Sequence, residues 1–316
     1  MTKTFFDYLN RAVMAAMANR LRNAIVVLSI QSVFAGAALA QAPVPVPKPA
    51  APDFKSEWSK QENIYRSEGD KVPSGYTIDR SLSDYVRALA AGFDSKLAAL
   101  TPADRWLDIG AGRGQAILDY FAPEYDITYP EGRAQRGIKA QTVAMSIEDR
   151  RTVEWRLIAA NKSANRLQYW FNRRLRDYTL QESGQFQLIT DVIGGFSYST
   201  DLSFFMEKVI SMLATGGIFY SVLQDVRSEA GTNEPYYEKA PFLTEIVNQK
   251  NEQLSVCSWL KRITCVEVIC ESKKGWRPPV QAYQVQKLCS DVKVPALTPV
   301  HFESGTPPER RYQLQD

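Results

Sequence analysis

The stretch WLDIGAGRGQ (106–115) constrains the fold more than any other part of this sequence. A short apolar segment carrying one acid, Asp108, runs directly into a glycine-rich turn. The glycines occupy every second position of that turn: Gly110, Gly112 and Gly114. Glycine tolerates positive φ and lets the backbone approach a ligand closely. A helix beginning near Gln115 would present free N–H groups and a positive dipole end to that ligand. The stretch therefore predicts a buried strand, a ligand-binding turn and a helix in succession.

Alternating strand and helix patterns continue along the chain. The apolar segments at 105–111, 140–147, 166–172, 186–193 and 218–224 are typical of buried strands. Helices are expected at 115–122 and 202–213, where the apolar residues follow helical spacing. The segments 263–272 and 280–288 alternate like an antiparallel ribbon. This order predicts an α/β fold, a doubly wound seven-stranded sheet whose last strand is antiparallel.

Three further segments receive expectations of their own. Residues 53–100 read as helical with breaks, with Ser81 or Ser83 as the expected cap of the segment 81–100. Residues 242–254 read as one more helix. The polar stretch 224–237 is expected to be a loop or lid. The tail 295–316 has no periodicity and is expected to be poorly ordered.

The spacing of the glycine turn distinguishes between two ligand classes. A nicotinamide or flavin dinucleotide requires G-x-G-x-x-G, which would place its third glycine at residue 115. Here that residue is Gln115, the pattern is G-x-G-x-G, and Asp108 precedes it, which favours an amino-acid-bearing nucleoside. The segment resembles the first motif of the class I S-adenosylmethionine (SAM) dependent methyltransferases, which have a Rossmann-like sheet. The resemblance extends over about 101–290, including FQLITDVIGGFSYSTDLSFFMEKVISMLATGGIFYSVL (186–223).

The resemblance implies roles for individual residues. Asp108 would order the amino group of SAM, and the turn would contact its methionine part through Gly110, Ala111, Gly112 and Gly114. Asp177 matches the acid that meets the adenine amino group, and Asp191 matches a position lining the pocket beside the substrate. Surface charge or helix capping is the alternative role for each acid.

One departure from the family concerns the second strand. The family usually places there an acid that binds both ribose hydroxyls, but this chain has Ser146. Glu148 takes that role if the strand runs slightly longer. Otherwise ribose binding is weakened, and a catalytically inactive binding protein of the cell envelope becomes the alternative function.

Methyl transfer from SAM requires alignment of the acceptor, and a base only where the acceptor must lose a proton. No catalytic residue is assigned by the sequence; Asp191, Tyr198 and Tyr129 are the candidates for a base. Gly75-Tyr76 and Arg80 are expected to fold over the cofactor.

The acceptor is expected to be a small molecule or a protein side chain. The segment DVIGGFSYS (191–199) lacks the Asn/Asp-Pro-Pro-aromatic motif that the family uses on bases. Outside residues 1–40 the chain has 34 basic and 34 acidic residues, so nucleic acid is not expected as a partner. The segment from Arg133 to Arg176, however, contains eleven Lys or Arg residues and three Asp or Glu residues. This excess of basic residues indicates either a solvated face or a surface for an anionic substrate. His301 is the only histidine, and no metal site is expected.

The amino-terminal region predicts export. A basic segment precedes the apolar run 24–40, and Ala38-Leu39-Ala40 has the small-x-small pattern of a signal-peptide cleavage site. Residues 1–40 are therefore interpreted as a signal peptide, with a membrane anchor as the alternative. A Pro-rich linker (41–60), a helical cap (61–100) and a SAM-binding domain (101–294) are expected to follow. The protein would be periplasmic or secreted, with membrane contact only through its amino-terminal segment, although SAM is made in the cytosol.

The four cysteines agree with export because they lie together in the last quarter of the chain. If the two ribbon strands pair, Cys265 falls nearly opposite Cys289, which leaves Cys257 for Cys270. The alternative is four buried reduced thiols.

Overall fold

The computed structural model describes residues 54–63, 80–121, 140–161, 166–224, 226, 242–273 and 279–315. The expected signal peptide, most of the Pro-rich linker, the segment 227–237 and the residues Gly75, Tyr76 and Tyr129 lie outside this part of the chain. Within it, no helix is long and apolar enough to cross a membrane.

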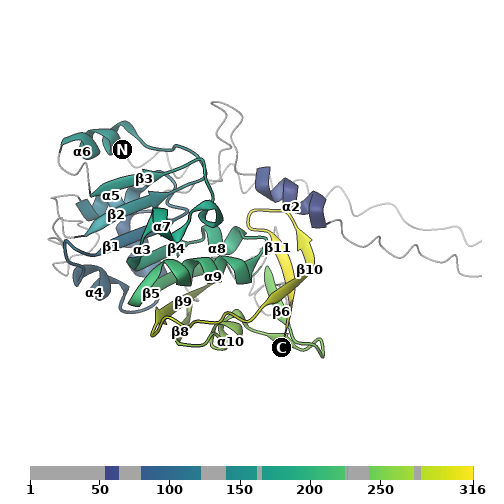
Figure 1. The fold of residues 1–316 in the computed structure, drawn as a ribbon. Coiled ribbons are helices and arrows are strands. Elements are labelled where there is room, and N and C mark those ends of the chain that lie inside the picture. The colour runs from purple at the N-terminus through teal and green to yellow at the C-terminus, as the bar shows by residue number, and fades with distance from the viewer. Residues whose placement is uncertain are drawn as a thin grey trace, which may run out of the picture. The chain divides into compact units, whose positions relative to one another are not determined.

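The central feature is a seven-stranded sheet with the order β3-β2-β1-β4-β5-β9-β8 (Figure 1). Five strands run parallel: β1 (Arg105–Ile109), β2 (Gln141–Met145), β3 (Leu167–Trp170), β4 (Phe186–Val192) and β5 (Leu213–Gln224). The strand β9 (Val280–Lys287) is antiparallel to both of its neighbours, β5 and β8 (Val266–Lys273). The predicted α/β sheet with an antiparallel last strand is confirmed.

Helices cover both faces of this sheet because its central strands are apolar on both sides. One core joins Trp106, Ala144 and Leu188 to the helices α3 (Leu82–Ala88), α4 (Phe93–Ala98), α5 (Gln115–Phe121) and α6 (Val153–Asn161). The other core joins Leu107 and Ile189 to η1 (Leu175–Asp177), α8 (Gly195–Tyr198), α9 (Leu202–Met212) and α10 (Val256–Leu260). A short helix, α7 (Leu180–Ser183), precedes β4.

The segment 81–100 forms α3 and α4 with a break between them, and Ser81 is the N-cap of α3. Its side chain accepts a hydrogen bond from the Asp84 amide, and the Asp84 carboxylate accepts one from Ser81 in return. These helices pack against one face of the sheet. The expected cap domain, 61–100, stays a prediction.

Two expectations about the carboxyl-terminal part are wrong. Residues 242–254 do not form a helix: β6 (Thr244–Val247) and β7 (Gln253–Leu254) form a hairpin. The Asn248 side chain accepts hydrogen bonds from the amides of Lys250 and Glu252, and Asn251 has a φ of 63°. An Asx turn followed by a left-handed residue ends any helix here.

The tail 295–316 is the second correction, because it contains β10 (Leu297–Glu303) and β11 (Glu309–Leu314). They complete a four-stranded sheet with the order β10-β11-β6-β7, drawn in yellow and green in Figure 1. Arg310, Tyr312 and Leu314 alternate along β11 and are buried, so the strand is anchored by side chains from one face.

The helix α2 (Phe54–Asn63) lies within the residues expected to be linker and cap, and it packs against this small sheet. Trp58 contacts Phe302 edge-on at 6.4 Å between ring centroids. Gln61 exchanges two hydrogen bonds with the backbone of Gly305.

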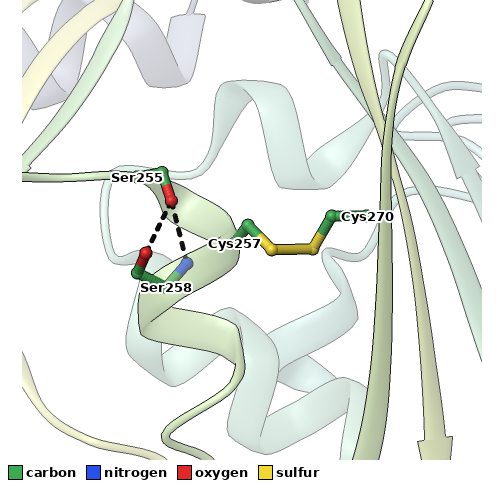
Figure 2. The surroundings of a disulfide bond; sticks show 4 residues. All are labelled: Ser255, Cys257, Ser258 and Cys270. Carbon is green, nitrogen blue, oxygen red and sulfur yellow. Dashed lines mark hydrogen bonds between the residues drawn. A yellow bond between two sulfur atoms is a disulfide. The ribbon is translucent and has the colours of Figure 1, made fainter.

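Two disulfides, Cys257–Cys270 and Cys265–Cys289, join the cysteines as the ribbon register predicted. The first links α10 to β8, and Figure 2 shows Cys257 pointing from the helix to Cys270 on the strand. Ser255 caps α10 by accepting a hydrogen bond from the Ser258 amide. The second closes the β8–β9 ribbon at the end where the Leu288 amide bonds the Cys265 carbonyl.

Candidate functional site

A cavity of about 270 Å³ opens at the carboxyl ends of the parallel strands. Its floor is formed by residues that end or follow β1, β2 and β4: Ile109, Gly110 and Gly112, then Met145, Ser146 and Ile147, then Ile193, Gly194 and Gly195. Its walls come from η1, from the segment 198–201, from α9, and from Arg80 and Gln61. In a doubly wound sheet this is the edge at which ligands bind.

The glycine turn meets the loop after β4 back to back. Gly110 has a φ of 73°, and a Cβ built on it would lie 2.7 Å from the Cα of Gly194. A Cβ on Gly194 would lie 2.6 Å from the carbonyl oxygen of Ile109. A side chain at either position would therefore force the two loops apart, so both glycines are required by packing as well as by backbone conformation.

The other residues of the turn support the floor from behind. Gly114 has a φ of 82°, and a Cβ there would lie 2.4 Å from the Trp155 ring of α6. Ala111 is buried, and its amide donates to the Met145 carbonyl across 2.9 Å. The structure thus places Gly110 and Gly112 on the cavity, whereas Ala111 and Gly114 are not among its described lining residues.

Asp108 lies beneath the turn and is fully buried. It accepts hydrogen bonds from the Tyr85 hydroxyl at 2.9 Å and from the Thr190 hydroxyl at 2.7 Å. Burial raises the pKa of Asp108 to about 7, although both hydrogen bonds act in the opposite direction. The carboxyl group is thus held below the floor and does not line the cavity. Its predicted contact with the SAM amino group stays a prediction.

Asp191 is the last but one residue of β4 and is also fully buried. Its two carboxyl oxygens accept hydrogen bonds from the amides of Gly194 and Phe196, each at 2.9 Å. Burial raises the pKa of Asp191 to about 7, while the two amides oppose the shift. The residue therefore shapes the β4 loop and the start of α8, and is not among the described residues that line the cavity.

The end of β2 brings Ser146 and Ile147 to the cavity and leaves Glu148 beside it. The Ser146 amide is bonded to the Trp170 carbonyl at 3.0 Å, which fixes its position next to β3. Glu148 pairs with Arg150 at 3.0 Å, and it is Arg150 that lines the cavity. The structure therefore brings Ser146 to the cavity, while Glu148 is not among its described lining residues. The predicted ribose contact of Glu148 stays a prediction.

Asp177 lies at the end of η1, where its carboxylate accepts a hydrogen bond from the Arg174 amide at 2.9 Å. Its side chain is 48% exposed and does not reach the described lining. Its neighbours Arg174, Leu175 and Arg176 do line the cavity. The predicted adenine contact of Asp177 stays a prediction.

Of the candidate bases and covering residues, Tyr198 and Arg80 reach the cavity. Arg80 donates to the carbonyl of Val192 at 3.1 Å, which ties the start of α3 to the end of β4. Asp191 is held away from the cavity by its own loop.

Several wall residues were missed by sequence reasoning, notably Phe204 and Lys208 of α9 and Gln61 of α2. Amphipathic spacing identifies α9 as a helix but does not reveal that two residues on one side of it meet a ligand site. The arginines of η1 fall in the basic stretch 133–176, so their signal was present in the charge pattern.

The wall formed by residues 198–201 is anchored by the small sheet. Arg310 of β11 is buried and donates to the carbonyls of Phe196 at 2.8 Å and Ser199 at 2.6 Å. The Tyr312 hydroxyl donates to the Thr200 carbonyl at 3.2 Å. A segment expected to be disordered therefore holds one side of the candidate site.

Within the described ranges there is no group of three or more His, Cys, Asp or Glu side chains placed to hold a metal ion. The predicted cofactor is SAM, an organic molecule, and a cavity with a glycine floor and partly apolar walls suits such a ligand.

No protein-family model matches the sequence, and no curated protein matches it. Solved structures with a similar fold include phosphoethanolamine N-methyltransferase 2 of Haemonchus contortus in complex with phosphomonomethylethanolamine and S-adenosylhomocysteine. That match has 12% identity and a TM-score of 0.40, and covers 66% of this chain and 57% of that one. A second is a putative rRNA methylase from Clostridium thermocellum, with 14% identity, a TM-score of 0.35 and coverage of 68% and 99%.

A third is a putative S-adenosylmethionine dependent methyltransferase from Listeria monocytogenes, with 15% identity and a TM-score of 0.37, covering 63% of this chain and 99% of that one. One of these proteins is named as an rRNA methylase, so the comparisons give no support to the exclusion of nucleic acid. Sequence identities of 12–15% and TM-scores of 0.35–0.40 do not indicate which reaction this chain catalyses.

Proposed function

We propose that this protein is a SAM-dependent methyltransferase. The observation that carries the proposal is the position of Gly110 and Gly112, which form the cavity floor at the carboxyl end of β1. The motif around them resembles the SAM-binding turn of class I methyltransferases. The strand order, with β9 as the antiparallel strand, agrees with the sheet that this resemblance implied.

The donor would lie across the glycine turn and the end of β2. Its sulfonium supplies the leaving group for methyl transfer, so the chain has to orient the two reactants and exclude water. Gly110 and Gly112 allow close approach of the methionine part, and Ser146 and Ile147 face the expected ribose. Tyr198 is the described candidate that can hold or accept a proton at its hydroxyl, because it reaches the cavity from α8.

The direct test is calorimetric titration of SAM and S-adenosylhomocysteine into the oxidised full-length chain. We expect saturable binding of both, with NADH as a dinucleotide control that does not bind. Absence of SAM binding at millimolar concentration overturns the proposal, and NADH binding in its place would point to an oxidoreductase.

Ser146 offers a gain-of-function test of the binding mode. Ser146→Asp restores the carboxylate that the family uses on the ribose hydroxyls, at a position that lines the cavity. A charge-assisted hydrogen bond contributes about 1.5–3 kcal/mol, so SAM affinity should rise about tenfold or more. The control is Asp104→Ser, which changes a residue before β1 that lies outside the described lining. This variant should leave the affinity for SAM unchanged. Thr142→Asp cannot serve as a control because Thr142 is buried.

We also propose that the protein acts outside the cytosol, in the periplasm or as a secreted protein. Two disulfides support this location, because such bonds persist mainly in oxidising compartments. Mass spectrometry of the mature amino terminus tests it: a terminus at Gln41 is expected. An intact terminus in a membrane fraction would instead support the anchor.

A further inference from the structure

The described lining of the cavity is strongly cationic. It includes Arg80, Arg150, Arg174, Arg176 and Lys208 against one carboxylate, that of Asp201. Asp201 is the N-cap of α9 and accepts a hydrogen bond from the Phe204 amide at 3.0 Å. Its charge is therefore directed to the helix end.

Two of the cations act on acids at or below the floor. Arg150 pairs with Glu148 at 3.0 Å. The charge of Arg80 acts on the buried Asp108 and Asp191, which lie beneath the floor. The other cations of the described lining are Arg174, Arg176 and Lys208, which we call the basic wall.

The basic wall is built by η1 and α9, which pack against each other, together with Arg174, the residue before η1. The Lys208 ammonium donates to the carbonyl of Tyr178, a neutral acceptor at the C-cap of η1. Arg176 has Asp177 at 3.9 Å, with both side chains about half exposed, so solvent screens that pair. Three cations on two packed elements of a concave site create a positive potential that attracts anions.

The proposed donor increases the positive charge of the cavity. SAM carries a sulfonium and an ammonium against one carboxylate, so it adds one net positive charge to a lining in which cations already outnumber carboxylates. A neutral or cationic second ligand would leave that repulsion in place, whereas an anionic one would relieve it.

We propose that the methyl acceptor is a small molecule bearing a phosphate or carboxylate group, which the basic wall binds. This inference rests on the proposed function. Guanidinium and ammonium groups both bind these oxyanions, and arginine can bind either one through two parallel hydrogen bonds.

The test uses pyrophosphate and acetate as anion probes and SAM as the donor, each titrated at constant ionic strength into the oxidised full-length chain. The test variant is Arg174→Gln/Arg176→Gln/Lys208→Gln, in which the new side-chain amide at position 208 can still donate to the Tyr178 carbonyl. The matched control is Lys250→Gln/Lys261→Gln/Lys293→Gln, which removes the same charge from residues outside the lining.

We expect at least one anion probe to bind the wild type and the control, and to bind the test variant about tenfold or more weakly. SAM affinity should be the same in all three proteins. The probe that binds more tightly identifies the group as phosphate or carboxylate.

Three results separate the two proposals. If SAM binds and neither probe binds, or if the control loses anion affinity as much as the test variant, the anionic acceptor is wrong and the proposed function stands. If the test variant loses SAM affinity, the wall binds the donor's own carboxylate, and the acceptor inference is again wrong. If SAM does not bind but an anion binds at the wall, the methyltransferase proposal fails and an anion site remains.

Discussion

The seven-stranded sheet and the small four-stranded sheet contribute to the same cavity in different ways. The large sheet supplies the floor directly, through loops that follow β1, β2 and β4. The small sheet supports the wall that is formed by residues 198–201. Arg310 and Tyr312 of β11 donate hydrogen bonds to carbonyls of residues 196–200, which precede or form part of that wall. The floor thus depends on a local motif, and the wall depends on contacts between residues more than 100 positions apart.

The largest expected effect comes from removing the link between the small sheet and the wall. Arg310→Ala leaves the carbonyls of Phe196 and Ser199 and the hydroxyl of Thr244 without this donor. We expect the free energy of unfolding in urea to fall by about 3–4 kcal/mol. Arg311→Ala is the matched control on the same strand; its partly exposed ion pair with Glu245 predicts a loss of under about 1 kcal/mol. Equal losses in the two variants would show that β11 does not support the wall.

Next in size is the effect of the disulfides, which strengthen the edge of the large sheet near the small one. Cys257 and Cys270 are 13 residues apart, and Cys265 and Cys289 are 24 apart. Replacing either pair with serine should lower the free energy of unfolding by about 3 kcal/mol. If the Cys257–Cys270 bond holds α10 against β8, its loss should also speed hydrogen exchange in α10, which the other pair should leave unchanged. Differential scanning calorimetry and exchange measurements together check both points.

A pH titration examines the buried acids beneath the floor. The pKa of Asp108 is raised to about 7, so its charged form is disfavoured in the folded protein. Its contribution to stability is complete below the unfolded pKa and is lost as pH rises through the folded value. Between pH 5 and pH 8 this loss should be about 2–3 kcal/mol.

Asp108→Asn should reduce the slope of unfolding free energy against pH, while Asp191 continues to contribute in the same direction. Asp177→Asn removes an exposed carboxylate and serves as the comparison for the change in net charge. A slope in Asp108→Asn as steep as that of the wild type would be inconsistent with a carboxyl group held mainly neutral by burial.

The smallest expected change in stability separates backbone strain from ligand binding. Gly112 and Gly216 have φ values of 58° and 80°, so alanine strains either backbone by about 1 kcal/mol. A Cβ on Gly216 has open space around it, and Gly216 is not a described lining residue. Both variants should have a slightly lower melting temperature, but only Gly112→Ala should lose affinity for SAM in calorimetry. Unchanged affinity would remove Gly112 from the binding floor.

The large sheet could be predicted because its parallel strands are short apolar segments bounded by turn residues, while β8 and β9 alternate as an antiparallel ribbon does. The tight turn after β1 could likewise be predicted, because the conformations of Gly110 and Gly112 depend on local sequence. The Cys265–Cys289 pair followed from the pairing of the β8–β9 ribbon, and the Cys257–Cys270 pair followed by elimination.

The small sheet could not be predicted in the same way, because its strands are short and pair across long stretches of chain. Residues 244–254 carry apolar spacing that also fits a helix, and the Asn248 turn decides against it. In β11, Arg310, Tyr312 and Leu314 alternate on one face of the strand. Because one of these buried residues is an arginine, the segment lacks the apolar alternation that predicts a strand.

The roles of the acids depended on side-chain orientation, which residue order does not report. Asp108 and Asp191 are each the last but one residue of neighbouring strands. The first is held by hydroxyls, and the second by amides of the loop that follows it. Glu148 follows β2 but pairs with Arg150, which leaves Ser146 at the cavity. Only the folded arrangement distinguishes a residue that lines the site from one that supports it.

The close contact between Gly110 and Gly194 has a consequence for how a ligand can enter. Because the two loops touch through their backbones, the floor cannot widen without breaking the packing between the ends of β1 and β4. Any motion that widens the cavity therefore involves its walls, which include α9 and η1. A ligand that enters past η1 and α9 would pass the elements that carry the positive charge of the cavity. The same side of the molecule would then both admit the ligand and select it by charge.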